Sequence, residues 1–437
     1  MANEKEKLKK RKSDSQRAWQ DISGMVADAF VPNDNDAGMK KVVEEYKQEM
    51  LHWTTNEESD YENPMKRATQ EHWYSLYLGK KRLENHGIGV QYEEYRQINN
   101  ISPQDPPSTA FFYKPDGKYV MCLARQFVRV RKNFIRNGAV IGREQQDLQM
   151  DYYITRAQNK DGLYICPNCG GEQTLDKLLD GCDYCKSKFD ISAYDDKVMS
   201  VMKNKGSYTD RSINKDLGAT TVFGVLMAIL GVPAFVLGLL LAPSTFGVSL
   251  IIAILGAVPL YLCYKSVINY YVNIYQVVYR LQDHNPGFSE EEFIGSLDCK
   301  LKAIHYASNP QELAAFVKCD IAPYLKSYQN IVDCETGRIS YKNFSIQGDY
   351  QYVELHREIN VMEDCGSQLR AAGGFVKVVL AKKVAYKLKN DVVLYRCNGC
   401  GATVSLLEGG KCRYCGNEMD YDTYDWVVVQ YQHVPEI

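Results

Sequence analysis

Eight of the 14 cysteines fall into two groups whose spacing is typical of a four-cysteine metal site. Each group consists of two Cys-x-x-Cys pairs separated by about a dozen residues. Two residues between paired cysteines let the backbone curl into a knuckle that directs both thiolates at one ion, and two knuckles complete a tetrahedron. The predicted ligands are Cys166, Cys169, Cys182 and Cys185 in the first group, and Cys397, Cys400, Cys412 and Cys415 in the second.

Zinc is the metal that four sulfur ligands without histidine or carboxylate favour, although iron in a rubredoxin-like site has the same geometry. A site with four protein ligands keeps no open position for water, so we expect two structural zinc ions rather than catalytic ones. Metal binding in such zinc ribbons contributes on the order of 10 kcal/mol to folding and requires deprotonated thiols. Because an oxidising compartment would convert these thiols to disulfides, the two groups indicate a reducing, cytoplasmic environment.

Length and composition indicate a protein with several globular cores. The chain has 437 residues, of which 45% are apolar and 24% charged, so it can bury more than one core. Its formal net charge of -2 gives the whole chain no bias toward nucleic acid. Residues 1–20 are strongly basic, and no apolar run of signal-peptide type follows them. We expect a solvated tail there, with contact to anionic lipid headgroups as the alternative.

A long uncharged stretch predicts two transmembrane helices. No charged residue occurs between Leu217 and Tyr264, and a bilayer core takes about 20 apolar residues per helix. The spans are predicted at residues 217–241 and 246–265, on either side of a turn at residues 242–245. Lysines and arginines flank both spans while the turn has none, so both termini are predicted to be cytoplasmic. The predicted localisation is that of an integral protein of a bacterial cell membrane.

The two cysteine groups belong to an internal repeat. Counted from the last ligand of each group, residues 189–195 align without a gap on residues 419–425. Upstream, residues 52–56 are similar to residues 305–309. Each half therefore contains the same order of elements, with helices first, then strands, and a zinc ribbon near its end.

Within each half, the residue patterns predict helices followed by an antiparallel sheet. In the second half Ser289 is a predicted N-cap with Glu292 three positions on, and Phe288 and Phe293 form a hydrophobic staple. Residues 115–117, Pro-Asp-Gly, carry a hairpin signal in the first half. Strand-like segments on both sides of each cysteine group place the ribbon at the tip of an extended hairpin. The apolar helix face expected in the first half consists of Met39, Val42, Val43, Tyr46 and Met50.

The second half contains the segment Asp-His-Asn-Pro-Gly-Phe-Ser-Glu-Glu-Glu-Phe at residues 283–293, followed by an amphipathic helix, Asn309 and Pro310, strands and a late Trp426. In these features it resembles the membrane-associated domain of a mitochondrial protein, subunit 44 of the inner-membrane translocase, and its bacterial relatives. The resemblance implies a cone-shaped α+β fold, similar to nuclear transport factor 2, that lies on a membrane and recruits partners without catalysis. The mitochondrial protein has neither zinc ribbons nor a transmembrane hairpin, so a role in mitochondrial import does not follow.

These patterns and the resemblance define one predicted architecture. The fold class is α+β, with two cone-shaped helix-on-antiparallel-sheet domains, each with a four-cysteine zinc ribbon, joined by an α-helical transmembrane hairpin. The predicted boundaries are 1–20 for the basic tail, 21–202 for the first domain with its ribbon at 163–190, 203–216 for a juxtamembrane linker, 217–241 and 246–265 for the spans, and 266–437 for the second domain with its ribbon at 394–420.

The preferred functional hypothesis is a membrane-anchored scaffold without enzymatic activity. It would recruit a protein or lipid partner in membrane transport or envelope assembly, and a homo-oligomer is compatible with it. An enzyme is the first alternative, because a cone-shaped fold can hold a pocket with acid–base residues. The sequence contains no phosphate loop, nucleophile elbow or histidine metal motif. The conceivable acid–base residues are His52, His305, Asp283 and Asp320.

Nucleic-acid binding is the second alternative. It rests on Arg125, Arg129 and Arg131, which alternation places on one face of a strand. Acidic residues in and after both ribbons would repel a phosphate backbone, and anionic lipid would satisfy the same arginines. The sequence therefore argues against a nucleic-acid partner and for membrane lipid and a protein partner.

Overall fold

The computed structural model of the chain divides into two compact units. The larger unit comprises residues 33–206 and 284–437 and holds both halves of the repeat, and the smaller comprises residues 1–32 and 207–283. The predicted domain boundaries are not tested by this division. The two α+β halves, which were predicted as separate domains, lie together in the larger unit. The structure describes residues 37–55, 65–98, 108–113, 119–155, 163–166, 169, 171–174, 177, 181–186, 196–204, 236, 237, 240, 257, 258, 261, 276–285, 288–384, 397, 399–400, 410–412, 414–423 and 425–434.

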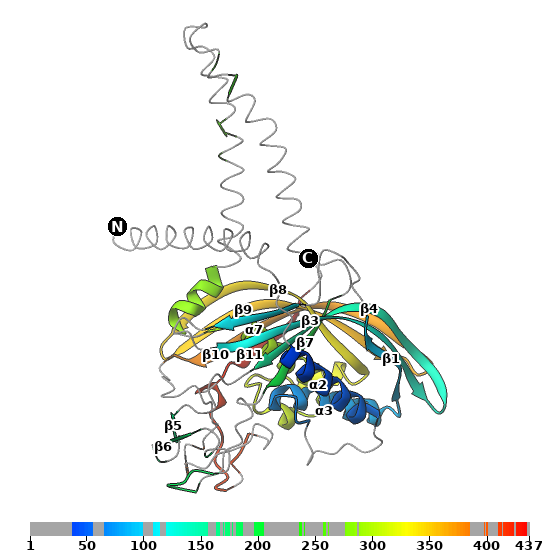
Figure 1. Cartoon of the computed structure of the whole chain (residues 1–437), viewed down its shortest axis with the longest axis horizontal. Coiled ribbons are helices and arrows are strands. Elements are labelled where there is room, and N and C mark those ends of the chain that lie inside the picture. The colour runs from blue at the N-terminus through cyan, green and yellow to red at the C-terminus, as the bar shows by residue number, and fades with distance from the viewer. Residues whose placement is uncertain are drawn as a thin grey trace. The chain divides into compact units, whose positions relative to one another are not determined.

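The first half consists of two helices packed on an antiparallel sheet (Figure 1). Its elements are α2 (Ala37–Thr55), α3 (Gln70–Asn85), β1 (Gly89–Gln97), β2 (Ser108–Tyr113), β3 (Tyr119–Arg136), β4 (Ala139–Thr155) and β7 (Lys197–Asn204). The sheet has the order β1-β3-β4-β7, and β2 pairs with β3. Asn137 and Gly138, with φ of 50° and 78°, form the two-residue turn between β3 and β4. An Asn-Gly turn of this kind matches the right-handed twist of the paired strands.

The second half repeats this arrangement with shorter helical segments before the sheet. Its elements are α7 (Glu290–Tyr306), η2 (Pro310–Leu313), α8 (Ala322–Ser327), β8 (Ile331–Gln347), β9 (Tyr350–Asp364), β10 (Leu369–Lys383), η3 (Tyr421–Thr423) and β11 (Val427–Val434). The sheet is antiparallel in the order β8-β9-β10-β11. Buried and half-buried residues alternate along β9, so one face of this sheet is turned toward the core.

The two halves have the same topology. Apart from β2, which also pairs with β3, each sheet orders its strands as they occur in the chain, and each has one isolated parallel bridge onto its last strand. In the first half this bridge joins Ala68 to Val198, and in the second half it joins Val317 to Val428. The bridges set a register between the halves in which Val198 corresponds to Val428. This agreement in strand order and bridging supports the internal repeat.

Both cysteine groups lie in the connection between two neighbouring antiparallel strands. In the first half the connection joins β4 to β7, and in the second it joins β10 to β11. This pairing confirms the prediction that each ribbon interrupts a hairpin. The first ribbon contains a small two-stranded sheet of β5 (Leu163–Ile165) and β6 (Glu172–Thr174). Residues 115–117 lie outside the described residues, and β2 and β3 on either side of them pair antiparallel.

Local signals in the sequence account for the helix starts and faces. Ser289 caps α7 by accepting a hydrogen bond from the backbone N–H of Glu292 at 3.2 Å, and the rings of Phe288 and Phe293 lie 5.6 Å apart. The predicted capping and hydrophobic staple are therefore confirmed. The five apolar residues predicted to share one face of the first helix are all buried in α2: Met39, Val42, Val43, Tyr46 and Met50.

A buried arginine joins the two halves. Arg82 on α3 donates hydrogen bonds to the carbonyl oxygens of Tyr306 at 2.9 Å and Tyr328 at 2.8 Å, and also to those of Ala307 and Gln329. A guanidinium is a planar fork of donors that suits several acceptors at once. These four carbonyl groups belong to the ends of α7 and α8, so the second half provides the acceptors for a side chain of the first. The halves are thereby tied into one folding unit.

The structure does not support the predicted transmembrane hairpin. Among the residues that the structure describes, no helix combines the length and the apolar character that a bilayer span requires. Helix α2 buries one apolar face and exposes charged side chains, whereas α7 buries the charged residues Asp298 and Lys300 together with its apolar ones. The apolar residues of both helices therefore belong to the protein core.

The sequence argument was the absence of charge between residues 217 and 264, a condition that a span requires but that does not by itself establish one. Residues 217–241 and 246–265 lie almost entirely outside the described residues, as do the basic tail 1–20 and most of the linker 203–216. The fold class of two domains joined by a helical transmembrane hairpin is therefore wrong, and so are the classification as a transmembrane protein and the localisation with two spans.

Candidate functional site

The first cysteine group converges as its spacing predicts. The Sγ atoms of Cys166, Cys169, Cys182 and Cys185 lie within 4.8 Å of one another. The Sγ atoms of Cys166 and Cys185 are 3.8 Å apart, and those of Cys169 and Cys182 are 3.6 Å apart. Four zinc–sulfur bonds of about 2.3 Å in a tetrahedron require sulfur–sulfur separations of about 3.8 Å. A disulfide would require about 2.05 Å, so the geometry fits a shared metal ion.

The second group has the same arrangement. The Sγ atoms of Cys397, Cys400, Cys412 and Cys415 also lie within 4.8 Å of one another. The distance is 3.3 Å between Cys397 and Cys415, and 3.6 Å between Cys400 and Cys412. In each group the first and third cysteines are buried, which places one side of each cluster against the protein. The two tetra-cysteine groups can therefore each bind a metal ion.

Backbone hydrogen bonds shape the knuckles. In the second ribbon the N–H of Gly416 donates to the carbonyl oxygen of Cys412 at 2.8 Å, and in the first the N–H of Lys186 donates to that of Cys182 at 2.7 Å. Gly416 and Lys186 each follow the last ligand and have φ of 74° and 57°. Glycine adopts this left-handed conformation without steric cost, whereas a lysine does not. The two ribbons thus share one backbone conformation after the last ligand, but only the second has a glycine at the left-handed position.

A third group with the geometry of a metal site consists of carboxylates, and these form ion pairs with two lysines. Carboxylate oxygens of Glu144, Asp333 and Glu335 lie within 4.8 Å of one another. The ammonium group of Lys132 is 2.7 Å from Glu144 and 3.3 Å from Asp333, while Lys203 is 3.6 Å from Glu144 and pairs with Glu335. Burial alone would raise the pKa of Glu144, but the two ammonium groups lower it below its ordinary value. These carboxylates serve an ion-pair network rather than a metal.

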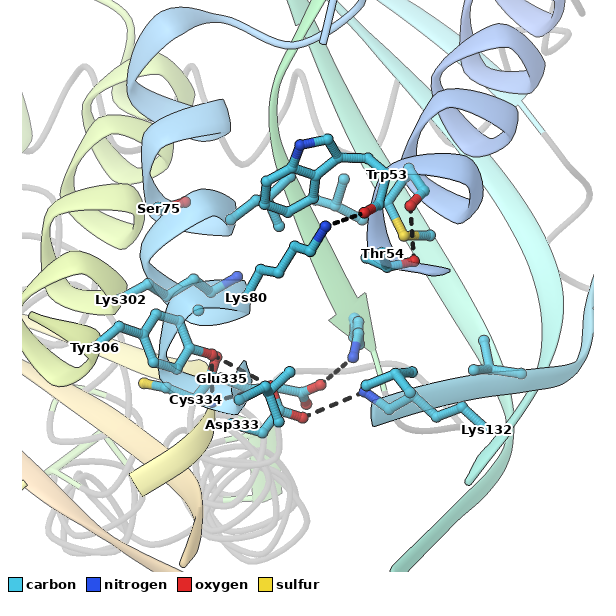
Figure 2. A pocket seen from close by; sticks show the side chains of 18 of the residues that line it. Trp53, Thr54, Ser75, Lys80, Lys132, Lys302, Tyr306, Asp333, Cys334 and Glu335 are labelled. Carbon is cyan, nitrogen blue, oxygen red and sulfur yellow. Dashed lines mark hydrogen bonds and ion pairs between the residues drawn. The ribbon is translucent and has the colours of Figure 1, made fainter. Parts of the chain in front are cut away.

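Four residues of this network, Lys132, Lys203, Asp333 and Glu335, form the floor of a cavity of about 190 Å³ (Figure 2). Helices α2 and α3 and the strands of the first sheet supply most of the cavity wall, and α7 and β8 of the second half complete it. Apolar and aromatic side chains dominate the wall, among them Met50, Trp53 and Phe134. The charged residues gather at one end, where Lys302 and Tyr306 stand beside Asp333. Sequence reasoning missed this cavity, because its residues come from segments far apart in the chain.

The residues conceived as acid–base groups of an enzyme lie in different environments. His52 and Asp320 are exposed, and the carboxylate of Asp320 accepts a hydrogen bond from the N–H of Ala322 at 3.1 Å, within its own helix start. Asp283 belongs to the smaller unit. His305 is buried, and its Nδ1 lies 2.7 Å from the carbonyl oxygen of Leu301. Of the three residues in the larger unit, His52 and Asp320 are thus exposed while His305 is buried, which is not the environment of one shared acid–base site.

The basic strand is neutralised by its neighbours. Arg125 and Asp151 form two hydrogen bonds, the shorter at 2.9 Å, across the pair β3–β4. Arg129 and Asp147 form two more at 2.7 Å, and Arg131 lies 3.3 Å from Glu94 on β1. Because each arginine already faces a carboxylate, the strand presents no row of free cations to a phosphate backbone.

Comparison of the chain with protein families, with curated proteins and with solved structures gives no match.

Proposed function

We propose that the chain is a binding scaffold without enzymatic activity, which recruits a protein partner through two structural zinc ribbons. The observation that carries this proposal is a tyrosine at the same place in each ribbon. Tyr184 precedes the last ligand of the first ribbon and Tyr414 that of the second, and they are 68% and 62% exposed. Exposed aromatic side chains on a rigid support are typical anchors of protein interfaces.

Zinc is the metal proposed for both ribbons. Four thiolates without nitrogen or oxygen ligands form a soft donor set, which suits zinc. Four protein ligands also leave no position for a water molecule, so the ions would hold the ribbons together and would not activate a substrate. A rigid ribbon presents its tyrosine at low entropic cost, since the aromatic ring has few rotatable bonds to immobilise.

The resemblance of the second half to the domain of translocase subunit 44 supports the same role. That domain is described above as one that recruits partners without catalysis. The arrangement of both ribbons on one duplicated unit adds a reason for two of them, because linked binding modules raise the effective concentration for the second contact. A partner with two apolar pockets could bind both tyrosines at once and would bind more tightly than through one of them.

The test is crosslinking of the tagged full-length chain in its own cells, followed by mass spectrometry of what co-purifies. We expect one partner that is lost when Tyr184 and Tyr414 are both changed to alanine. Ile346→Ala, which removes another exposed apolar side chain, is the matched control and should retain the partner. Metal analysis should give two zinc ions per chain in all three proteins, because the tyrosines are not ligands.

Two results would contradict this proposal. A partner retained by the double tyrosine variant would place the interface elsewhere. Zinc content unchanged in a Cys397→Ser, Cys400→Ser variant, compared with a Cys365→Ser control outside the ribbons, would show that the second group holds no zinc.

A further inference from the structure

The cavity lined by the first half and by α7 and β8 has the size of a small aromatic molecule. Its volume is about 190 Å³. An engineered cavity of about 150 Å³ lined by apolar side chains is known to bind benzene. The cavity therefore has room for one aromatic ring and a small polar group attached to it.

The apolar wall suits a flat ring. Trp53 at the end of α2 and Phe134 on β3 are both buried and both line the cavity. Met50, Met150 and Met202 line it as well, and methionines adapt their shape to a ring and contact it favourably through sulfur. Aromatic side chains add edge-to-face or offset stacking. This part of the cavity favours an aromatic over an extended aliphatic body.

In the ion-pair network on the floor, both ammonium groups already have carboxylate partners. Lys132 and Lys203 satisfy Glu144, Asp333 and Glu335, as described above, and the hydroxyl of Tyr306 donates to Asp333 at 3.2 Å. Two ammonium groups face three carboxylates in this network, so its formal charge is -1. A ligand with two negative charges would be repelled by this excess, and the network offers it no unpaired cation.

Lys302 is different from the other lysines of the cavity. It lies on α7, one turn before Tyr306, and Figure 2 shows its side chain directed into the cavity beside that of Lys80. Lys80 has partners, since its ammonium group donates to the carbonyl oxygen of Trp53 at 2.9 Å and lies 3.8 Å from Glu84. Among the carboxylates of the described residues, none forms an ion pair with Lys302. Lys302 stands at the charged end of the cavity near Asp333 but without an ion pair to it, so its ammonium group can pair with an anion that enters the cavity.

We propose that this cavity binds a small aromatic monocarboxylic acid, with its ring between Trp53, Phe134 and the methionines and its carboxylate paired with Lys302. One carboxylate supplies the single negative charge that Lys302 can pair. The ring occupies the apolar volume that the network leaves empty. This ligand site is independent of the ribbons and adds a small-molecule function to the proposed scaffold.

The experiment is isothermal titration of the full-length, zinc-loaded chain with phenylacetate, with neutral phenylacetamide and with phenyl phosphate. We expect phenylacetate to bind about tenfold or more tightly than the other two, since a hydrogen bond to a charged partner outweighs a neutral one. Lys302→Met should weaken phenylacetate binding by about tenfold and leave phenylacetamide binding unchanged. Lys302→Arg should retain most of the affinity.

Lys326→Met on α8 is the matched control, because Lys326 is exposed and does not line the cavity. It should bind phenylacetate as the unaltered chain does, and thermal unfolding of each variant verifies that it is folded. The proposal is overturned if phenylacetate and phenylacetamide bind equally, if Lys302→Met binds phenylacetate normally, or if phenylacetate does not bind at millimolar concentration. Failure of this test would not affect the tests of the ribbons, since the zinc ligands, Tyr184 and Tyr414 do not line the cavity.

Discussion

The two halves share a strand order but differ in what fills the space between helices and sheet. In the register set by Val198 and Val428, Tyr431 corresponds to Val201, and His433 to Lys203. Val201 and Lys203 line the cavity of the first half. Tyr431 and His433 instead form a cluster with Tyr328 and His305 in the second half.

The cluster of the second half is connected by hydrogen bonds. The hydroxyl groups of Tyr328 and Tyr431 lie 3.0 Å apart, and Tyr328 also pairs with His433. The ring of His305 stacks on Tyr328 with centroids 4.5 Å apart. The space next to the last strand is thus occupied by aromatic rings in the second half, whereas in the first half it opens on the cavity, which α7 and β8 of the second half complete. A hollow half is the less stable arrangement unless a ligand occupies it.

Zinc removal tests the part that both halves share, and it has the largest expected effect. Each ribbon should lose stabilisation on the order of 10 kcal/mol when a strong chelator removes its ion. Amide hydrogen exchange should then rise steeply in both ribbons and much less in β3, β4, β9 and β10. If exchange in these strands rose equally, the ribbons would be part of the folding unit of the sheets rather than separate modules. A matched sample with chelator and excess zinc is the control.

Opening the filled half is the next largest change. Tyr431→Val replaces the ring with the residue found in the first half and should lower the free energy of unfolding by about 3 kcal/mol, since it leaves a void and removes a partner of Tyr328. Urea unfolding measures this value. Tyr414→Val, which removes an exposed ring, is the control and should change the free energy of unfolding by less than about 0.5 kcal/mol.

The reverse substitution sharpens the comparison from the other side. Val201→Tyr should fill the first half and abolish phenylacetate binding there. A Val201→Tyr variant that still bound phenylacetate would show that the two positions do not occupy equivalent space.

How much of this comparison the sequence contains depends on the range of the interaction. The cap at Ser289, the apolar face of α2 and both cysteine groups depend on residues close together in the chain, and each was predictable. The repeat predicted that both halves share one order of helices and strands, but the order of the strands within each sheet came only from the structure. Lys132 and Asp333 are 201 positions apart, so their ion pair, and with it the cavity floor, follows only from how the halves pack. The uncharged stretch from residue 217 to 264 led to a wrong prediction of two membrane spans, because the absence of charge is compatible with several environments.

A buried histidine in each half makes both acid-sensitive. Burial lowers the pKa of His72 to about 3 and that of His305 to about 4, from 6.5. Both imidazoles stay neutral in the folded protein while the unfolded chain takes up protons below pH 6.5, so stability is complete above pH 6.5 and falls toward pH 4. At pH 5 the loss relative to pH 7.5 should be about 2 kcal/mol for each histidine.

Urea unfolding of His305→Gln at both pH values measures the share of the second half. The difference between pH 7.5 and pH 5 should shrink by about 2 kcal/mol relative to the unaltered chain. His52→Gln, at an exposed histidine, is the control and should keep the full difference. Zinc loss at low pH affects all three proteins alike and cancels in the comparison. An unchanged difference in His305→Gln would mean that His305 takes up its proton in the folded protein.

The smallest expected effect separates the two ribbons. Lys186 and Gly416 occupy the same left-handed position, but only the lysine bears the steric cost of its Cβ, about 1 kcal/mol. Lys186→Gly should therefore tighten zinc retention by the first ribbon about fivefold in competition with a chelator, and Gly416→Lys should weaken the second ribbon by a similar factor. Gly416→Asn should weaken it less, because asparagine tolerates this conformation. A Lys186→Gly variant that lost zinc faster would show that the lysine side chain stabilises its ribbon through a contact that outweighs the strain.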